Sequence, residues 1–238
     1  MTNTQMLAKL NEYVGMLDKE TQNEIIRIRD FDRSECCISN AKYGCAWTLG
    51  DLIYQLECDI KEEECAKKHG TSFKKQMDKL SKLVSSNTKK QMQHIWREHI
   101  DNYDYACACI FGSYAFFLKC DIPFHTYEHS DHVFLTPIYT EIYKNIVPEN
   151  ILLDVNNLKA QYKIYKTIPS NTRPKFKYIK IGTQYFNLEY LINICDVLGG
   201  EIKINNSKSV LGGAFLFGDN GEAILMPIHP RAVEGENQ

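Results

Sequence analysis

One strand, one helix and then three strands are predicted by IKIGTQYFNLEYLINICDVLGGEIKINNSKSVLGGAFLFGDNGEAILMPIHP, residues 179–230. Asn187 is suited to cap the helix at its N-terminus, and Gly199 with Gly200 to end it. The sequence Asp-Asn-Gly at residues 219–221 is a typical hairpin turn. An apolar run that ends in Met-Pro-Ile then closes the segment.

Residues 71–120 repeat much of this order. Phe73, Met77 and Leu80 have helical spacing, and strands are predicted at about residues 93–100, 105–111 and 114–120. Gly112 and Ser113 favour a two-residue turn between the last two strands. Two such helix-plus-antiparallel-strand units predict a pseudo-symmetric α+β domain whose two helices pack side by side against one continuous curved sheet.

The first seventy residues have a different pattern. Residues 5–29 show helical spacing with a break near Asp18. Thr48 is a candidate N-cap for a further helix, which Gly70 is suited to end. We therefore predict a cysteine-rich helical extension over residues 1–70 and an α+β domain over residues 71–234.

The two units are joined by a long connection. Residues 121–148 contain three prolines and predict a loop with a short helix near residues 137–146. A helix is expected from Val155 or Asn156 to about Lys166, followed by a hairpin rich in proline and lysine over residues 167–186.

Composition excludes several classes of protein. The 238 residues carry a net charge of −2, so no global basic field favours tight, indiscriminate nucleic-acid binding, and any DNA contact must be local. The sequence has neither a signal-peptide pattern nor an apolar run long enough to span a membrane. Nine scattered cysteines, several within apolar patterns, favour reduced thiols and a cytoplasmic location.

The C-terminal unit resembles a known family. The matching features are Phe186-Asn187 before a helix, Tyr190-Leu191-Ile192, an alternating strand over residues 201–204 and the run over residues 220–228. Together they resemble the bacterial DNA polymerase sliding clamp, and more narrowly the shortened clamp-like proteins of phages and Firmicutes. The first unit is similar through Trp96 and its hairpin, although residues 110–115 lack the acidic residue and the arginine of the family's turn.

This resemblance implies a non-enzymatic protein of phage or mobile-element origin that contacts DNA, a replication or defence protein, or both. A clamp subunit has three such domains and this chain has room for one, so a closed ring would require several copies. In the family, the closing strand leads to a Met-Pro signature beside the pocket for partner peptides. We therefore expect a partner-binding groove, or a strand that simply completes the core, at Met226, Pro227, Ile228, Leu153 and Tyr185.

Lysines gather in the helix that begins near Thr71. Such a helix lines the central hole of a clamp, and its lysines predict weak, salt-sensitive contact with DNA phosphates at Lys74, Lys75, Lys79, Lys82, Lys89 and Lys90. A solvated lysine face is the competing interpretation. The corresponding helix of the second unit carries Glu189 and Asp196 and no lysine.

A second basic segment alternates with aromatic residues. It comprises Lys159, Lys163, Lys166, Arg173, Lys175, Lys177 and Lys180, interleaved with Tyr162, Tyr165, Phe176 and Tyr178. This composition suits backbone contact and base stacking, and Lys175 and Lys177 are our candidate DNA ligands within it. Lysines that protect the edge of a hairpin from aggregation are the alternative.

Two groups of residues could bind metal. Residues 125–132 contain His125, Glu128, His129, Asp131 and His132, a polar loop or a metal site. Cys58, Cys65 and His69 share a helical face, with Cys36, Cys37 and Cys45 nearby in the sequence, although the paired spacing of a zinc site is absent. Neither group is our prediction, and we expect neither a metal nor a cofactor.

Two other functions compete with the clamp-like one. A phage anti-defence protein, such as an anti-CRISPR inhibitor, would use the same fold for protein binding alone. A metal-dependent hydrolase would use the histidine cluster at residues 125–132. The sequence has neither a phosphate-binding loop nor a nucleophile elbow, so we expect no enzymatic activity.

Overall fold

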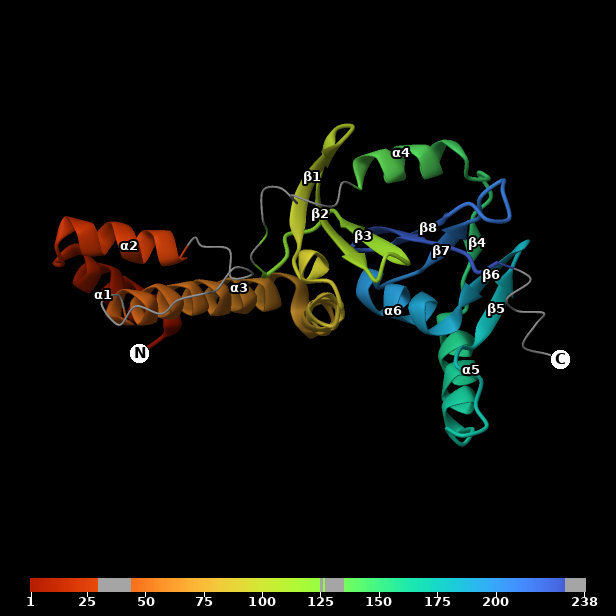
Figure 1. The fold of residues 1–238 in the computed structure, drawn as a ribbon, viewed down its shortest axis with the longest axis horizontal. Helices are drawn as coiled ribbons and strands as arrows, with labels where there is room; N and C mark the ends of the chain where they lie inside the picture. The colour runs from red at the N-terminus through yellow and green to blue at the C-terminus, as the bar shows by residue number, and fades with distance from the viewer. Residues whose placement is uncertain (30–43, 125, 127–134, 230–238) are drawn as a thin grey trace. The chain divides into compact units, whose positions relative to one another are not determined.

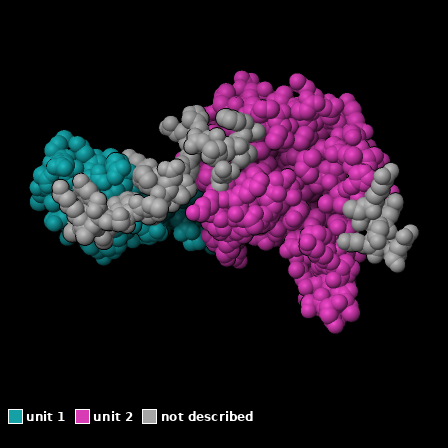
Figure 2. Space-filling view, in the orientation of Figure 1, with its two compact units in different colours: residues 1–74, 123–125 teal, residues 75–122, 126–238 magenta. Residues whose placement is uncertain are grey.

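The computed structural model describes residues 1–29, 44–124, 126 and 135–229, although not the side chains of residues 44–48 and 91 (Figure 1). The chain divides into two compact units, residues 1–74 with 123–125 and residues 75–122 with 126–238 (Figure 2). The division follows Lys74, close to the predicted boundary at Gly70. We call these the helical unit and the sheet unit.

Three helices build the helical unit. Helix α1 spans Asn3–Gly15, α2 spans Lys19–Arg29, and α3 spans Gly44–Ser85 and continues into the sheet unit. Thr2 caps α1, because its hydroxyl accepts a hydrogen bond from the backbone N–H of Gln5. Ile25, Ile28 and Ile53 form the core between the helices.

Helix α3 agrees with the prediction at Gly70 but not at its N-terminal end. Gly70 does interrupt the helix, with φ of 83° and ψ of 177°, a conformation that glycine adopts without a steric penalty. Thr48, however, lies inside the helix, which already begins at Gly44. The predicted N-cap was therefore wrong, because the helix had started one turn earlier.

The sheet unit contains a seven-stranded antiparallel sheet. Its strands are β1 Trp96–Ile100, β2 Tyr103–Ile110, β3 Tyr114–Leu118, β4 Ile151–Leu152, β7 Lys203–Asn205, β8 Ala214–Gly218 and β9 Gly221–Leu225. They lie in the order β1-β2-β3-β9-β8-β7-β4. A separate two-stranded sheet contains β5 Tyr178–Ile181 and β6 Gln184–Asn187.

The sheet has two related halves. The last part of α3 precedes β1, β2 and β3, and α6, Leu188–Leu198, precedes β7, β8 and β9. The halves meet where β3 pairs with β9, over five residue pairs centred on Phe116 and Ala223. The predicted α+β class and the repeated order of one helix and three strands are confirmed. The strand predicted before α6 belongs to the separate sheet and not to the continuous one.

Two layers of helix cover the sheet. Figure 1 shows α4, Thr136–Lys144, on one face and α6 on the other. Beneath α4, Cys107, Phe117 and Phe215 are fully buried with Leu135 and Tyr139 of the α4 segment. Alternate residues of the same strands, such as Ala106, Phe116 and Leu216, are buried on the α6 face.

The connection between β2 and β3 is one residue longer than predicted. Ile110 pairs with Tyr114, so the connection consists of Phe111, Gly112 and Ser113, with φ of 52° at Phe111 and 67° at Gly112. A positive φ is strained for phenylalanine. The buried side chain of Asn87 stabilises this turn, since its Oδ1 accepts from the backbone N–H of Phe111 at 2.8 Å and its Nδ2 donates to the carbonyl oxygen of Cys109 at 3.0 Å.

Candidate functional site

A basic arm extends from the sheet unit. It begins with α5, Val155–Thr167, and returns through residues 168–177 to β5 and β6. Figure 1 shows α5 and the returning segment projecting away from the seven-stranded sheet. We use the name basic arm for residues 155–187.

The arm has an unusual charge. It carries seven Lys and Arg residues and no Asp or Glu, whereas the rest of the chain carries 21 Lys and Arg against 30 Asp and Glu. The cations are Lys159, Lys163, Lys166, Arg173, Lys175, Lys177 and Lys180. A local positive field therefore exists on a protein of net negative charge, and it attracts anions at distances below the Debye length of about 10 Å.

The arm is anchored at its base. Asp154 caps α5 by accepting from the backbone N–H of Asn157 at 3.0 Å. Leu158 and Tyr165 on α5 are buried. The backbone N–H of Ile228 donates to the carbonyl oxygen of Tyr185 at 2.7 Å, so the C-terminal segment adds a bridge to the edge of β6. These contacts hold the lysines on a fixed scaffold.

Several cations of the arm lie over aromatic rings. The Lys166 ammonium is 4.9 Å from the ring centroid of Tyr162, and the Lys175 ammonium is 5.2 Å from that of Phe176. The Arg173 guanidinium is 5.4 Å from the Tyr165 ring. Each contact orders a cation without neutralising it, because an aromatic ring has no net charge. Burial, with a smaller contribution from Glu189, raises the pKa of Tyr162, so its hydroxyl stays neutral near pH 7.

The predicted lysines of α3 have three different settings. Lys74 belongs to the helical unit, where its ammonium is 3.5 Å from the Glu62 carboxylate. Lys75 and Lys82 are exposed, as are Lys89 and Lys90 beyond the helix. Lys79 lies 3.8 Å from the carboxylate of Asp196 on α6. The structure thus does not bring all six into one cluster.

Asp196 has a second cationic partner. Its Oδ1 is 2.6 Å from the Lys159 ammonium on α5, while its Oδ2 faces Lys79 on α3. The carboxylate therefore joins α3, α6 and α5 on the same side of the sheet unit. The sequence of α6, with Glu189 and Asp196 and no lysine, predicts no matching basic surface and gives no sign of this convergence.

The residues of the predicted partner groove make separate local contacts. Tyr185 and Ile228 are paired through their backbones, and Met226 is 39% exposed. The Met226 sulfur lies close to Gly213, where an added Cβ would approach it to 3.2 Å. The backbone N–H of Leu153 instead donates to the Ile202 carbonyl oxygen. The structure shows these residues as parts of several strand ends and not as the walls of one described pocket.

An apolar hollow of about 280 Å³ lies instead in the helical unit. It is open to solvent and is lined mainly by α1 and α3, through Met1, Met6, Lys9, Leu10, Tyr13, Leu52 and Leu56. The periodicity of α1 predicted an amphipathic helix but gave no sign of this hollow.

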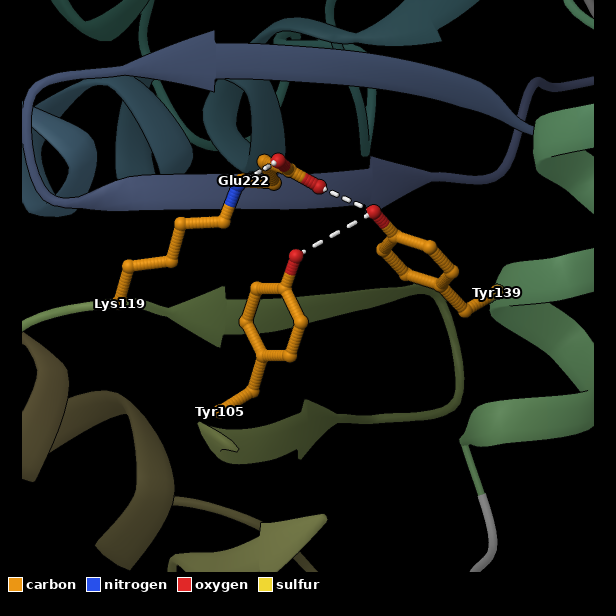
Figure 3. A network of polar contacts seen from close by, with 4 residues as sticks. All are labelled: Tyr105, Lys119, Tyr139 and Glu222. Carbon is orange, nitrogen blue, oxygen red and sulfur yellow. Dashed lines mark hydrogen bonds and ion pairs between the residues drawn. The ribbon is translucent and has the colours of Figure 1, made fainter. Parts of the chain in front are cut away.

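A polar network lies under α4 (Figure 3). The Tyr139 hydroxyl donates to Glu222 Oε2 at 2.6 Å, and the Lys119 ammonium contacts Glu222 Oε1 at 2.6 Å. The Tyr105 hydroxyl lies 3.5 Å from that of Tyr139. Burial, then the bond to Glu222, raises the pKa of Tyr139. Burial opposes ionisation of Lys119, but the hydrogen bond and charge of Glu222 outweigh it and raise the pKa of this ammonium.

A second carboxylate holds the start of α4. Glu98 on β1 accepts from the backbone N–H groups of Leu135 at 2.9 Å and Thr136 at 2.7 Å, and also from the Thr136 hydroxyl. The indole N–H of Trp96 donates to the same carboxylate at 2.6 Å. Glu98 thus replaces a local N-cap, and with Glu222 it binds α4 to the sheet.

The structure describes only some of the residues that could bind metal. Across the described ranges, no group of three or more His, Cys, Asp or Glu side chains is placed to hold a metal ion, and this includes Cys58, Cys65 and His69. The histidine cluster at residues 125–132, Cys36 and Cys37 fall outside the described residues, as does the side chain of Cys45. Burial raises the pKa of Cys107, Cys109 and Cys195, that of Cys195 to about 12, so these thiols are poor nucleophiles near pH 7.

Comparisons with known proteins leave the resemblance to sliding clamps as a prediction. No protein-family model, curated protein or solved structure matched the chain. Within the part of the chain that is described, no helix has both the length and the apolar character needed to cross a bilayer.

Proposed function

We propose that this protein is a non-enzymatic nucleic-acid-binding protein whose basic arm contacts the phosphate backbone. The observation that carries the proposal is the concentration of seven cations, without one carboxylate, on an element that projects from the sheet unit. Nucleic acid is the polyanion that such an array fits, because each neutralised phosphate releases condensed counterions.

The aromatic residues of the arm support the same function. Tyr162, Phe176 and Tyr178 are half-buried, and cations lie over two of these rings. A partly exposed ring beside a cation offers a base a stacking surface next to a phosphate contact. We therefore expect binding with little sequence preference, and tighter binding to single strands than to duplex.

The clamp-like role belongs to this proposal. The repeated order of one helix and three strands supports a clamp-like scaffold, and the resemblance of the C-terminal unit to sliding clamps implies a phage or mobile-element origin. In that role the protein would contact DNA, and a replication or defence protein through its C-terminal strand, without chemistry of its own.

The test is a salt titration of binding to a fluorescent DNA strand of about 30 nucleotides. We expect Lys175→Gln with Lys177→Gln to weaken binding at about 50 mM salt roughly tenfold. The slope of log affinity against log salt should also decrease in magnitude by about 1.4, because each lost phosphate contact contributes about 0.7 for a single strand.

The matched control is Lys144→Gln with Lys208→Gln. Both lysines are exposed residues of the sheet unit outside the arm, so the net charge changes equally. The control should bind nearly as the unmodified protein does. Equal losses in the two double variants, or no retention of DNA by the unmodified protein at low salt, would exclude the arm as the binding site.

A further inference from the structure

Three helices present charged groups on one face of the sheet unit. The last part of α3, α6 and α5 are linked through Asp196, which faces Lys79 at 3.8 Å and Lys159 at 2.6 Å. Lys79 and Lys159 come from segments eighty residues apart in the sequence. The basic arm and the lysines of α3 are therefore neighbours on one surface, with α6 between them.

On this surface a row of lysines on α3 and a row of lysines on α5 lie on either side of an acidic stripe on α6. Lys75, Lys79 and Lys82 repeat at the spacing of one helical face on α3, and Lys159, Lys163 and Lys166 repeat similarly on α5. On α6, Glu189, Asn193 and Asp196 form the stripe between them. Asp196 is the member of this stripe that contacts both basic rows.

Lys79 and Lys159 can leave Asp196 for another anion at a small cost in free energy. Its side chain is 27% exposed, and those of Lys79 and Lys159 are 36% and 50% exposed. Ion pairs that are this exposed to solvent contribute little to stability. Both ammonium groups can thus leave Asp196 for another anion without disrupting the packing of the helices.

We propose that Asp196 attenuates nucleic-acid binding by occupying a phosphate position between the basic arm and α3. This inference rests on the proposed function and extends it. The phosphate backbone of a bound strand would run from α5 across α6 to the lysines of α3. A bound strand would displace the carboxylate from Lys79 and Lys159, and its affinity would be lowered by that competition.

The test is Asp196→Asn, which keeps the size of the side chain and removes its charge. We expect affinity for the same DNA strand to rise about three- to tenfold at low salt, because two ammonium groups become available to phosphate. The slope of log affinity against log salt should steepen by about 0.7 to 1.4. The melting temperature should change little, since the ion pairs are exposed.

Glu141→Gln is the control for net charge. Glu141 is an exposed residue of α4, which covers the opposite face of the sheet, and its substitution removes the same charge. A gain in affinity equal to that of Asp196→Asn would show a general charge effect and would overturn the inference. Asp196→Ser offers a second variant of the same test, should the asparagine variant fold poorly.

A double-mutant cycle shows whether the liberated lysine makes the contact. Lys79→Gln should reduce affinity less in the native background, where Asp196 competes with phosphate for Lys79, than in the Asp196→Asn background. Additive effects would contradict the inference.

The outcomes separate the two proposals. If the arm variant loses affinity while Asp196→Asn binds as Glu141→Gln does, the arm function stands and the attenuation by Asp196 is wrong. If the arm variant and its control bind alike, the proposed function itself is wrong.

Discussion

Single buried polar residues determine the local geometry of the sheet unit. Asn87 is 3% exposed, and its amide satisfies the backbone of a hairpin more than twenty residues away. A positive φ at Phe111 persists because this contact stabilises it. A side chain that hydrogen-bonds in this way specifies the turn more strongly than the preferences of the turn residues themselves.

Tyr139 should make stability depend on alkaline pH. Its hydroxyl is held protonated by burial and by Glu222, so its pKa in the folded state exceeds the ordinary value near 10. Below that value the hydroxyl is protonated in both states and contributes no pH dependence. Above it, the unfolded chain releases the proton more readily, so the free energy of unfolding falls as pH rises.

We predict that Tyr139→Phe lowers the free energy of unfolding at pH 7 by about 1–3 kcal/mol, because Glu222 loses a buried hydrogen-bond donor. The further loss of stability between about pH 10 and pH 11.5 should be smaller than in the unmodified protein. Urea unfolding across this range measures both effects.

Tyr143→Phe is the control, because Tyr143 lies on the same helix and is 53% exposed. It should retain stability within about 0.5 kcal/mol and keep the full alkaline dependence. An equal alkaline dependence in Tyr139→Phe and Tyr143→Phe would refute a special role for Tyr139.

At the scale of elements, the pairing of β3 with β9 joins the two halves of the sheet. Gly221 begins β9 with φ of 143°, directly opposite Leu118. A Cβ at this position would lie 2.3 Å from the carbonyl oxygen of Phe117 and 2.9 Å from the Cα of Leu118. Backbone atoms of the neighbouring strand thus allow only glycine here.

Gly221→Ala should therefore lower the free energy of unfolding by about 3 kcal/mol or more, measured by urea denaturation. Gly112→Ala provides the comparison, since Gly112 also has positive φ, at 67°, but a Cβ there would meet open space. That change should reduce stability by only about 1 kcal/mol. Similar effects of both substitutions would contradict the close approach at β3.

At the scale of the whole molecule, the two units have separate cores. Ile25, Ile28 and Ile53 pack within the helical unit, while Trp96, Phe117 and Phe215 belong to the sheet unit. Helix α3 runs through both units, and Gly70 interrupts its helical geometry. We expect each unit to open without the other.

Hydrogen exchange tests this independence. Ile28→Ala should accelerate amide exchange in α1, α2 and the first part of α3, because a cavity in that core reduces its stability by about 2–4 kcal/mol, and should leave β2, β3 and β9 protected. Phe116→Ala, in the sheet unit, should show the reverse pattern. Faster exchange across both units in either variant would mean that they unfold together.

Much of the fold was predictable because its signals are local. Asn187 and Gly199 cap the two ends of α6, Gly70 interrupts α3, and the Asp-Asn-Gly turn does form the hairpin between β8 and β9. The prediction for Thr48 was wrong, and the predicted Gly112-Ser113 turn was one residue too short. In the first case the helix began upstream, and in the second Asn87 favoured a different turn from the one that local preferences indicated.

The candidate site was predictable only in part. Lys175 and Lys177 were recognisable from composition, and the absence of carboxylates over residues 155–187 was a further signal in the sequence. The meeting of Lys79, Asp196 and Lys159 was not predictable, because no local pattern indicates which helices lie side by side. The same holds for Lys119 and Glu222, which are 103 residues apart.

The sequence by itself determined the order of most helices and strands, which faces are apolar and where positive charge concentrates. These properties depend on capping groups, periodicity and composition within a few residues. Only the tertiary structure decided the strand order, the junction of β3 with β9 and the cations that Asp196 neutralises. Those features depend on packing between distant segments, whose contacts form only when the whole sheet and its helices bury a common core.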